Sequence, residues 1–98
     1  MRSFILLNVV ILLSQVIYSQ DLQKIDSLKL QLRASDHPAE ILNQISQAYL
    51  NVSPEKALEY AKLAREEAYR EKDEADFGVA LKNAALAYQS LGEYERSI

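Results

Sequence analysis

The sequence predicts an all-α protein in which antiparallel helix pairs stack into a solenoid, preceded by a signal peptide. Three observations predict this class. The chain includes only two Gly and two Pro and is rich in strong helix formers. Apolar residues recur every three or four positions along segments that are separated by Pro and by cap-type residues. One of these segments, around Ala87-Tyr88, repeats the pattern of an earlier one around Ala48-Tyr49.

Composition and charge exclude several classes of function. The chain is 49% hydrophobic and 26% charged, and its formal net charge of -3 becomes -4 once the segment that contains Arg2 is removed. A nucleic-acid partner is not expected, because neutralising phosphates requires a basic surface. The chain has no Cys, so disulfides, thiolate metal sites, Cys nucleophiles and an acylated lipoprotein cysteine are excluded.

The segment 1–19 has the features of a secretory signal peptide. Arg2 supplies a positive start, and residues 4–13 form an apolar run, broken only by Asn8, of the length expected for a signal core. Ser19 is a small residue suited to the position before the cleaved bond. We therefore expect cleavage between Ser19 and Gln20.

An uncleaved membrane anchor is the alternative interpretation of this segment. Residues 4–18 are fewer than the roughly 20 that a spanning helix needs. A cleavage site within Tyr-Ser-Gln resembles signals of Gram-negative bacteria of the Bacteroidetes type. That resemblance implies an exported protein in the periplasm or cell envelope, with membrane contact only through the export signal or a downstream segment.

Amphipathic spacing predicts a leading helix over residues 20–35 and a second helix from Pro38 to about Asn51. Ser35 to Pro38 separates them, with cap-type side chains followed by a Pro at a helix start. The apolar residues of the two helices are Leu22, Ile25, Leu28 and Leu32, then Ile41, Leu42, Ile45, Ala48 and Tyr49. The leading helix is interpreted as an end cap or a degenerate half-repeat.

Ser53 and Pro54 predict the start of a third helix that extends to about Glu71. Small residues follow one side of it: Ala57, Ala61, Ala64 and Ala68. Asp73 is expected to cap a fourth helix that runs to Leu91, with Gly92 as its stop. A fifth helix is expected from residue 93 to the end.

Self-comparison indicates a repeat. Ala48-Tyr49 recurs as Ala87-Tyr88, and at the same offset Leu42 aligns with Leu81 and Ile45 with Ala84. We therefore divide the chain into one repeat over residues 38–72 and a second, incomplete repeat over residues 73–98. At least about three repeats are usually needed for stability, so we expect this chain to be the N-terminal part of a longer protein.

The second copy resembles the first two-thirds of a tetratricopeptide repeat (TPR). The matching positions are Leu81, Ala84, Ala85, Tyr88, Gly92 and Tyr94, and Ser97 replaces the usual Ala. The earlier copy matches at Leu42, Ile45, Tyr49, Ala57, Ala61 and Ala64, but Ser53-Pro54 replaces the Gly-x-Tyr turn. The step from Tyr49 to Tyr88 is longer than the usual TPR period of about 34 residues. The chain is therefore similar to long-period TPR variants of exported and signalling proteins of Bacteroidetes.

This resemblance implies a right-handed solenoid whose first helices line a groove for a protein or peptide. By resemblance, the candidate partner-binding residues are Asn43, Gln47, Lys82, Asn83 and Gln89. Their amide groups can donate to and accept from a peptide backbone, and the Lys can meet an acidic group. The alternative is that these residues are ordinary solvated helix surface.

We expect no catalytic residues, cofactor or metal site within this chain. His37 is the only His and lies in an Asp-His-Pro turn with no Cys or second His to join it. The acidic residues near residues 66–76 lack the spacing of a calcium loop and are interpreted as solvated helix ends, with Glu66 and Arg70 as an i,i+4 pair. The tyrosines are expected mainly in the core or between helices.

The sequence therefore predicts an exported protein-interaction module, and it leaves other functions open. The segment also resembles the periplasmic sensor region of membrane-bound two-component histidine kinases, where a membrane helix and a catalytic domain would follow Ile98. A helical-bundle enzyme would need a Glu-x-x-His pair, which is not present. A non-functional truncated fragment is the last alternative.

Overall fold

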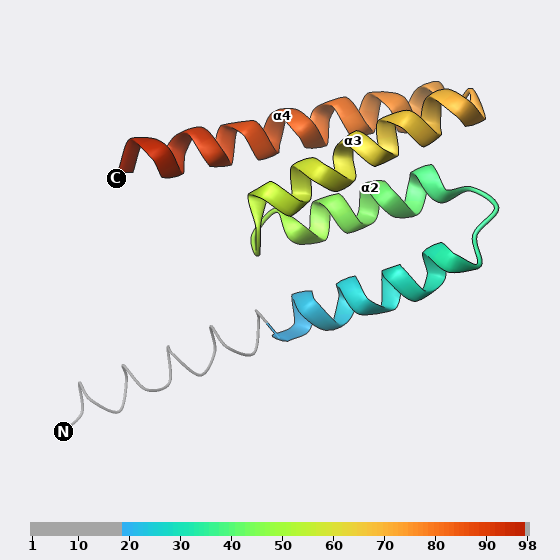
Figure 1. Ribbon diagram of the computed structural model, residues 1–98, viewed down its shortest axis with the longest axis horizontal. Coiled ribbons are helices and arrows are strands. Elements are labelled where there is room, and N and C mark those ends of the chain that lie inside the picture. The colour runs from blue at the N-terminus through green and yellow to red at the C-terminus, as the bar shows by residue number, and fades with distance from the viewer. Residues whose placement is uncertain (1–18, 98) are drawn as a thin grey trace.

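The computed structural model describes the backbone of residues 19–97 and the side chains of residues 19–93, and this part of the chain is helical without any strand. Residues 19–33 form the first helix, followed by α2 (Pro38–Tyr49), α3 (Pro54–Glu71) and α4 (Glu74–Ser97). Consecutive helices run in opposite directions (Figure 1). The predicted all-α class is confirmed. The predicted signal peptide lies outside the described residues, except for Ser19.

Local sequence signals place the start of each later helix. Pro38 and Pro54 each occupy the first turn, where a missing N–H costs nothing. The Ser53 hydroxyl accepts a hydrogen bond from the Lys56 amide at 3.3 Å. At α4, the Asp73 carboxylate accepts from the Asp76 amide at 3.0 Å. These capping positions are the ones that the sequence predicts.

The helix ends differ more from expectation. Helix α3 ends at Glu71, and the following residue, Lys72, takes a left-handed conformation with φ of 58°. Helix α4 continues through Gly92 to Ser97, so the predicted stop at Gly92 and the separate fifth helix are wrong. Gly ends a helix when it adopts a left-handed conformation, and neither Gly of the described chain has a positive φ. A helical Gly costs only about 1 kcal/mol relative to Ala, which the rest of a long helix can offset.

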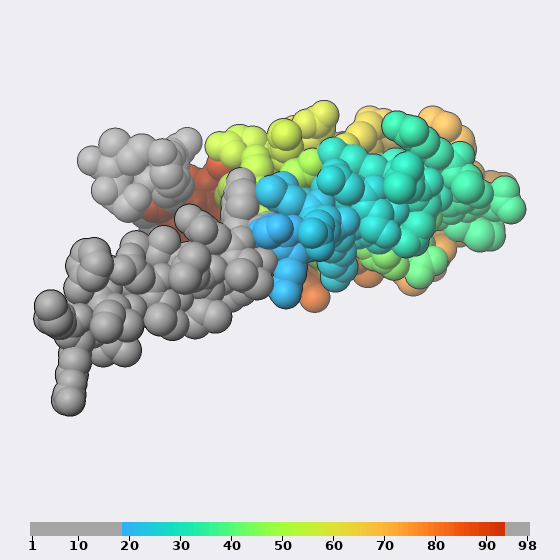
Figure 2. All heavy atoms as spheres, turned by 90° about the horizontal axis from the view of Figure 1, so that it is seen from below, coloured from blue at the N-terminus to red at the C-terminus, as the bar shows by residue number. Residues whose placement is uncertain are grey.

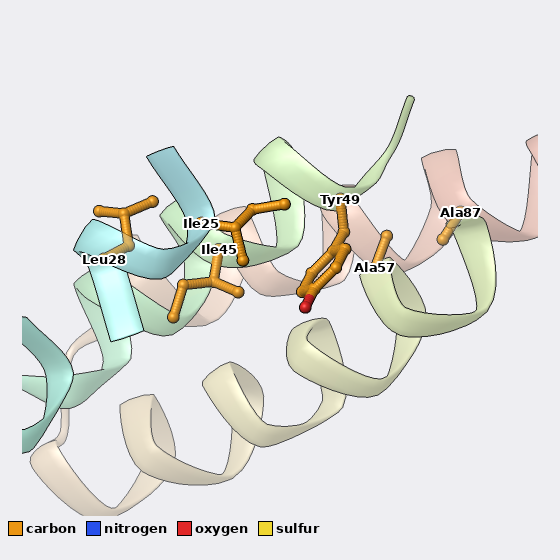
Figure 3. Packing of buried hydrophobic residues seen from close by; sticks show 6 residues of the cluster. All are labelled: Ile25, Leu28, Ile45, Tyr49, Ala57 and Ala87. Atoms are coloured by element: carbon orange, nitrogen blue, oxygen red, sulfur yellow. The ribbon is translucent and has the colours of Figure 1, made fainter. Parts of the chain in front are cut away.

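The first helix packs against α2 and α3 through only part of its apolar side. Ile25 and Leu28 are buried, Leu32 is half-buried, and Leu22 is exposed. Figure 3 shows Ile25 and Leu28 above Ile45 of α2, which continues the same core. In Figure 1, α4 lies at the top of the stack and the first helix lies at the bottom. Seen from below, the first helix therefore lies in front of the other helices (Figure 2).

Helix α3 contacts both α2 and α4. All four residues of its alanine stripe are buried: Ala57, Ala61, Ala64 and Ala68. Side chains this small allow neighbouring helix backbones to come close together. Leu42 and Ala80 pack around Ala64 from the two sides, so α3 is the central helix of the fold.

Two tyrosines join the first three helices. The Tyr49 and Tyr60 rings stack with their centroids 5.4 Å apart. The Lys29 Nζ of the first helix donates to the Tyr49 hydroxyl at 2.8 Å and lies 5.3 Å from the centre of that ring. This hydrogen bond raises the pKa of Lys29. Tyr49 therefore holds the first helix through its hydroxyl and α3 through its ring.

A pair of buried amides joins α2 to α4. Asn43 and Asn83 are each 3% exposed. The Asn83 Nδ2 lies 3.3 Å from both the backbone oxygen and the Oδ1 of Asn43. The Asn43 Nδ2 donates to the backbone oxygen of Asp76 at 3.0 Å. Because a buried amide needs its partners, this network fixes the register between the two helices.

The amide pair predicts strong coupling between Asn43 and Asn83. Asn43→Leu and Asn83→Leu should each lower the free energy of unfolding by about 1 to 3 kcal/mol. Asn43→Leu removes one acceptor of the Asn83 Nδ2 and the donor to the Asp76 backbone oxygen, and Asn83→Leu leaves the Asn43 Oδ1 without its donor. The double variant should lose less than the sum of the two, since the polar partners disappear together. Urea denaturation followed by circular dichroism measures all three variants. Additive losses would contradict this account of the pair.

Candidate protein-interaction surface

Among the described residues, large apolar side chains are exposed on the first helix, at Leu22 and Leu30, and along α3 and α4. Tyr69 is 78% exposed, Leu81 is 47% exposed and Tyr88 is 57% exposed. Tyr69 and Leu81 line an open groove between the two helices, together with the half-buried Phe77. Charged residues complete the lining of this α3/α4 groove: Arg65, Glu66, Arg70 and Lys72.

Five apolar residues of α4 form a continuous stripe. Successive members are spaced four, three, four and three positions apart, which keeps them on one side of the helix. We call this set the α4 stripe, and it comprises Phe77, Leu81, Ala84, Tyr88 and Leu91. A different side of α4, with Ala80, Asn83 and Ala87, packs into the protein interior. The stripe is therefore additional to the side that holds α4 in the fold.

The two copies of the repeat pattern differ in how far their side chains are exposed to solvent. In the first copy, all the named positions are buried: Leu42, Ile45, Tyr49, Ala57, Ala61 and Ala64. In the second copy, Leu81, Ala85 and Tyr88 are exposed, while Ala84 and Gly92 are half-buried. The side chain of Tyr94 lies outside the described residues. The same pattern thus makes a core in one copy and an open surface in the other.

The five residues named as partner-binding candidates do not form one site. Gln47, Lys82 and Gln89 are exposed. Asn43 and Asn83 are buried and hydrogen-bonded to each other, so their amides serve contacts inside the fold. Lys82 and Gln89 each follow a residue of the α4 stripe and lie two turns apart. They form a polar border beside the stripe, whereas Gln47 lies on α2.

The tyrosines also divide between the interior and the surface. Tyr49 is buried and Tyr60 is half-buried, as expected for residues between helices. Tyr69 and Tyr88 point to solvent, contrary to the expectation of a core role. Their exposure depends on which helices lie beside α3 and α4, and helical spacing within one segment does not contain that information.

Two carboxyl groups at the start of α4, those of Asp73 and Asp76, have shifted pKa values. The backbone amide of Asp76 lowers the pKa of Asp73 by donating to its carboxylate. Burial raises the pKa of Asp76, and the nearby charges of Asp73, Glu40 and Glu71 add to this effect. The Glu71 Oε1 is itself buried without a hydrogen-bond partner.

A salt bridge forms on α3 near the groove. The Arg70 Nη1 lies 3.0 Å from the Glu67 Oε1, a pair at i,i+3. The expected i,i+4 pair with Glu66 is therefore wrong, because the Arg70 side chain turns to the other acidic neighbour. An exposed pair of this kind contributes little to stability.

The described residues show neither a cluster of metal ligands nor a membrane-spanning helix. His37 is exposed, and its backbone amide donates to the Ser35 hydroxyl at 3.0 Å, so it occupies the turn as expected. Over residues 19–97, His and carboxylate side chains nowhere gather in a group of three that could hold a metal ion. In the same range, no helix is long and apolar enough to span a membrane.

Comparison with known proteins adds no family to these observations. No protein-family model matches the chain, and no match was found among the curated proteins or the solved structures. The geometry of the α4 stripe and the α3/α4 groove is therefore the basis for a functional interpretation.

Sequence reasoning did not identify the groove residues Arg65, Tyr69 and Phe77 as part of a surface. The spacing of the α4 stripe, which begins at Phe77, is the signal that points to Phe77, whereas the sequence holds no comparable signal for Arg65 and Tyr69 on α3. An apolar stripe beyond the side that packs into the core marks a helix with a second contact surface.

The start of α4 predicts two carboxyl groups with opposite pKa shifts. Carbon-13 NMR titration should find the pKa of Asp73 below its usual range and that of Asp76 above it. Asp73→Asn should lower the pKa of Asp76, because it removes a neighbouring charge. By linkage, the Asp73 charge stabilises the fold above about pH 4, and this contribution is lost as the pH falls through the lowered pKa. An unchanged pKa of Asp76 in the variant would contradict the coupling.

Proposed function

We propose that this protein is an exported interaction module that binds a protein or peptide through the outer surface of α3 and α4. The observation that carries the proposal is the exposure of Tyr69, Leu81 and Tyr88 along one surface. Contiguous exposed apolar side chains on a small domain mark interaction sites. Tyr in particular supplies a large contact area and is enriched among the residues that dominate binding energy.

The composition of the surface also suits a protein partner. The apolar side chains of the groove are bordered by Arg65, Arg70 and Lys72, and the stripe is bordered by Lys82 and Gln89. An apolar centre with a polar border is the usual organisation of protein interfaces. The groove is open rather than enclosed, which favours an elongated partner over a small molecule.

The arrangement of helices supports a repeat architecture of the TPR-like type. The helices are antiparallel neighbours, and α4 contacts both α2 and α3. In a solenoid, each helix pair covers the apolar surface of the one before it. On this proposal, α4 belongs to a second pair whose apolar side receives the partner.

Export is part of the proposal and rests on the apolar run of residues 4–13 behind Arg2. Mass spectrometry of the protein from its native cell should find a chain that begins at Gln20. A chain that retains residues 1–19 would contradict cleavage and favour an anchor.

Site-specific photo-crosslinking tests the binding surface. A benzoylphenylalanine placed at Leu81 or Tyr88 should form a discrete adduct with a protein in cells that express the native gene. The same group at Lys24, which is exposed on the first helix, serves as the control and should give no such adduct.

Two results would contradict the proposal. One is the absence of an adduct from both α4 positions while the variants remain folded by circular dichroism. The other is an identical set of adducts from the Lys24 control, which would indicate unspecific contact. Because Leu81 and Tyr88 are both exposed, we expect either substitution to leave the free energy of unfolding within about 0.5 kcal/mol of its original value.

A further inference from the structure

The α3/α4 groove offers a place for one large apolar side chain. Ala68, Tyr69 and Phe77 line a common hollow in this groove. Ala68 is buried and small, Phe77 is half-buried, and Tyr69 is largely exposed. An aromatic or long aliphatic side chain that enters the hollow would therefore bury apolar surface of both rings.

The same groove is basic, although the chain as a whole carries a formal net charge of -3. The charged side chains that line it beside Tyr69 are the cations Arg65, Arg70 and Lys72 and the carboxylate Glu66. Arg70 is paired with Glu67 at 3.0 Å, whereas Arg65 and Lys72 form no ion pair with other side chains of residues 19–93. These two cations are free to meet carboxylates of a partner.

Arg65 and Lys72 lie on either side of the apolar hollow. Tyr69 follows Arg65 by four positions and precedes Lys72 by three, so the three residues share one side of α3 and its C-terminal cap. Seven residues correspond to about 10 Å along a helix axis. An extended peptide covers that distance in about three residues. Beyond Lys72 the groove reaches Asp73 and Glu74, whose carboxylates would repel further acidic residues.

We propose that the α3/α4 groove binds an acidic segment of a partner protein, in which two carboxylates about three residues apart flank a large apolar side chain. One carboxylate pairs with Arg65 and the other with Lys72, while the apolar side chain lies against Tyr69 and Phe77. This inference rests on the proposed function and names the chemistry of its partner. Exposed ion pairs contribute little affinity by themselves, so the apolar contact supplies the binding energy and the charges select the partner.

A capped hexapeptide, Ser-Asp-Phe-Ser-Asp-Ser, is the probe. It places two carboxylates three residues apart with one aromatic side chain between them. One control peptide has Lys in place of both Asp residues, and another has Ser in place of Phe. A third has the same composition as the probe, with the two Asp residues adjacent and the Phe at the far end. Each control thus changes charge, apolar contact or spacing alone.

NMR titration of the nitrogen-15-labelled protein measures both affinity and location. The probe should cause saturable amide shifts centred on Arg65, Tyr69 and Phe77. The lysine peptide should bind at least ten-fold more weakly, because it presents cations to a basic groove, and the other two controls at least three-fold more weakly. No saturable shift with the probe, or equal affinities for the probe and the lysine peptide, would overturn the inference.

Variants of the protein separate the groove from the net charge. Arg65→Glu should weaken binding of the probe at least five-fold, and so should Tyr69→Ala. Lys24→Glu makes the same change in net charge on the first helix and should alter the affinity less than two-fold at about 0.15 M salt, where charges are screened beyond about 8 Å. All three residues are exposed, and circular dichroism verifies folding. Equal effects of the two charge reversals would overturn the inference.

Two further outcomes separate this inference from its alternatives. A hexameric oligothymidylate should bind more weakly than the probe, and tighter binding of this oligonucleotide would overturn the assignment to an acidic protein segment. If photo-crosslinking at Leu81 or Tyr88 identifies a partner protein while the probe does not bind, the proposed function stands and only the chemistry of the partner fails. If crosslinking and peptide binding both fail, the proposed function fails as well.

Discussion

The alanine stripe of α3 is the packing contact on which the positions of the other helices depend. Ala57, Ala61, Ala64 and Ala68 are buried between α2 and α4. Their size sets how closely both neighbours approach, and enlarging one of them would force the helices apart or leave side chains in strained rotamers. The close approach also brings the Ser46 hydroxyl within 2.7 Å of the Ala57 backbone oxygen, so that a polar group is satisfied inside the core.

The close packing of α2, α3 and α4 has a consequence for the outer surface of α4. The side of α4 that enters the core is made of small and polar residues, with Ala80 and Ala87 on either side of Asn83. The large apolar residues Phe77, Leu81 and Tyr88 lie on a different side. In α2, by contrast, the large residues Leu42, Ile45 and Tyr49 face the core and are covered by two other helices. The exposed α4 stripe thus follows from how α4 is packed, and the functional proposal follows from the exposed stripe.

Local features of this fold could be predicted from sequence because their causes lie within a few residues. Pro38, Pro54 and Asp73 mark helix starts through backbone geometry and side-chain capping, and each is found where the sequence predicts it. The end of α4 was not predicted, since a Gly stops a helix only if the following chain turns away. At Gly92 the helix continues.

The candidate surface was harder to predict, because exposure depends on neighbours that a single segment does not specify. Leu81 and Tyr88 fit the repeat pattern as well as Leu42 and Tyr49 do, yet only the latter pair is covered. Conversely, Asn43 and Asn83 are residue types that suit a polar groove, but their side chains hydrogen-bond to each other in the interior. A polar residue on an amphipathic helix can face solvent or a matching polar partner, and the sequence alone does not distinguish the two. The resemblance to TPR proteins remains a prediction.

The central claim is that the packing of α4 leaves Leu81 and Tyr88 exposed, while Leu42 and Tyr49 at the corresponding positions of α2 are covered. Paramagnetic relaxation of side-chain NMR signals by a soluble gadolinium chelate tests it most directly, because the chelate acts on groups that solvent reaches. The account predicts strong relaxation of the Leu81 methyl groups and the Tyr88 ring, and weak relaxation of the Leu42 methyl groups and the Tyr49 ring. Equal protection of the two pairs would contradict an open surface on α4.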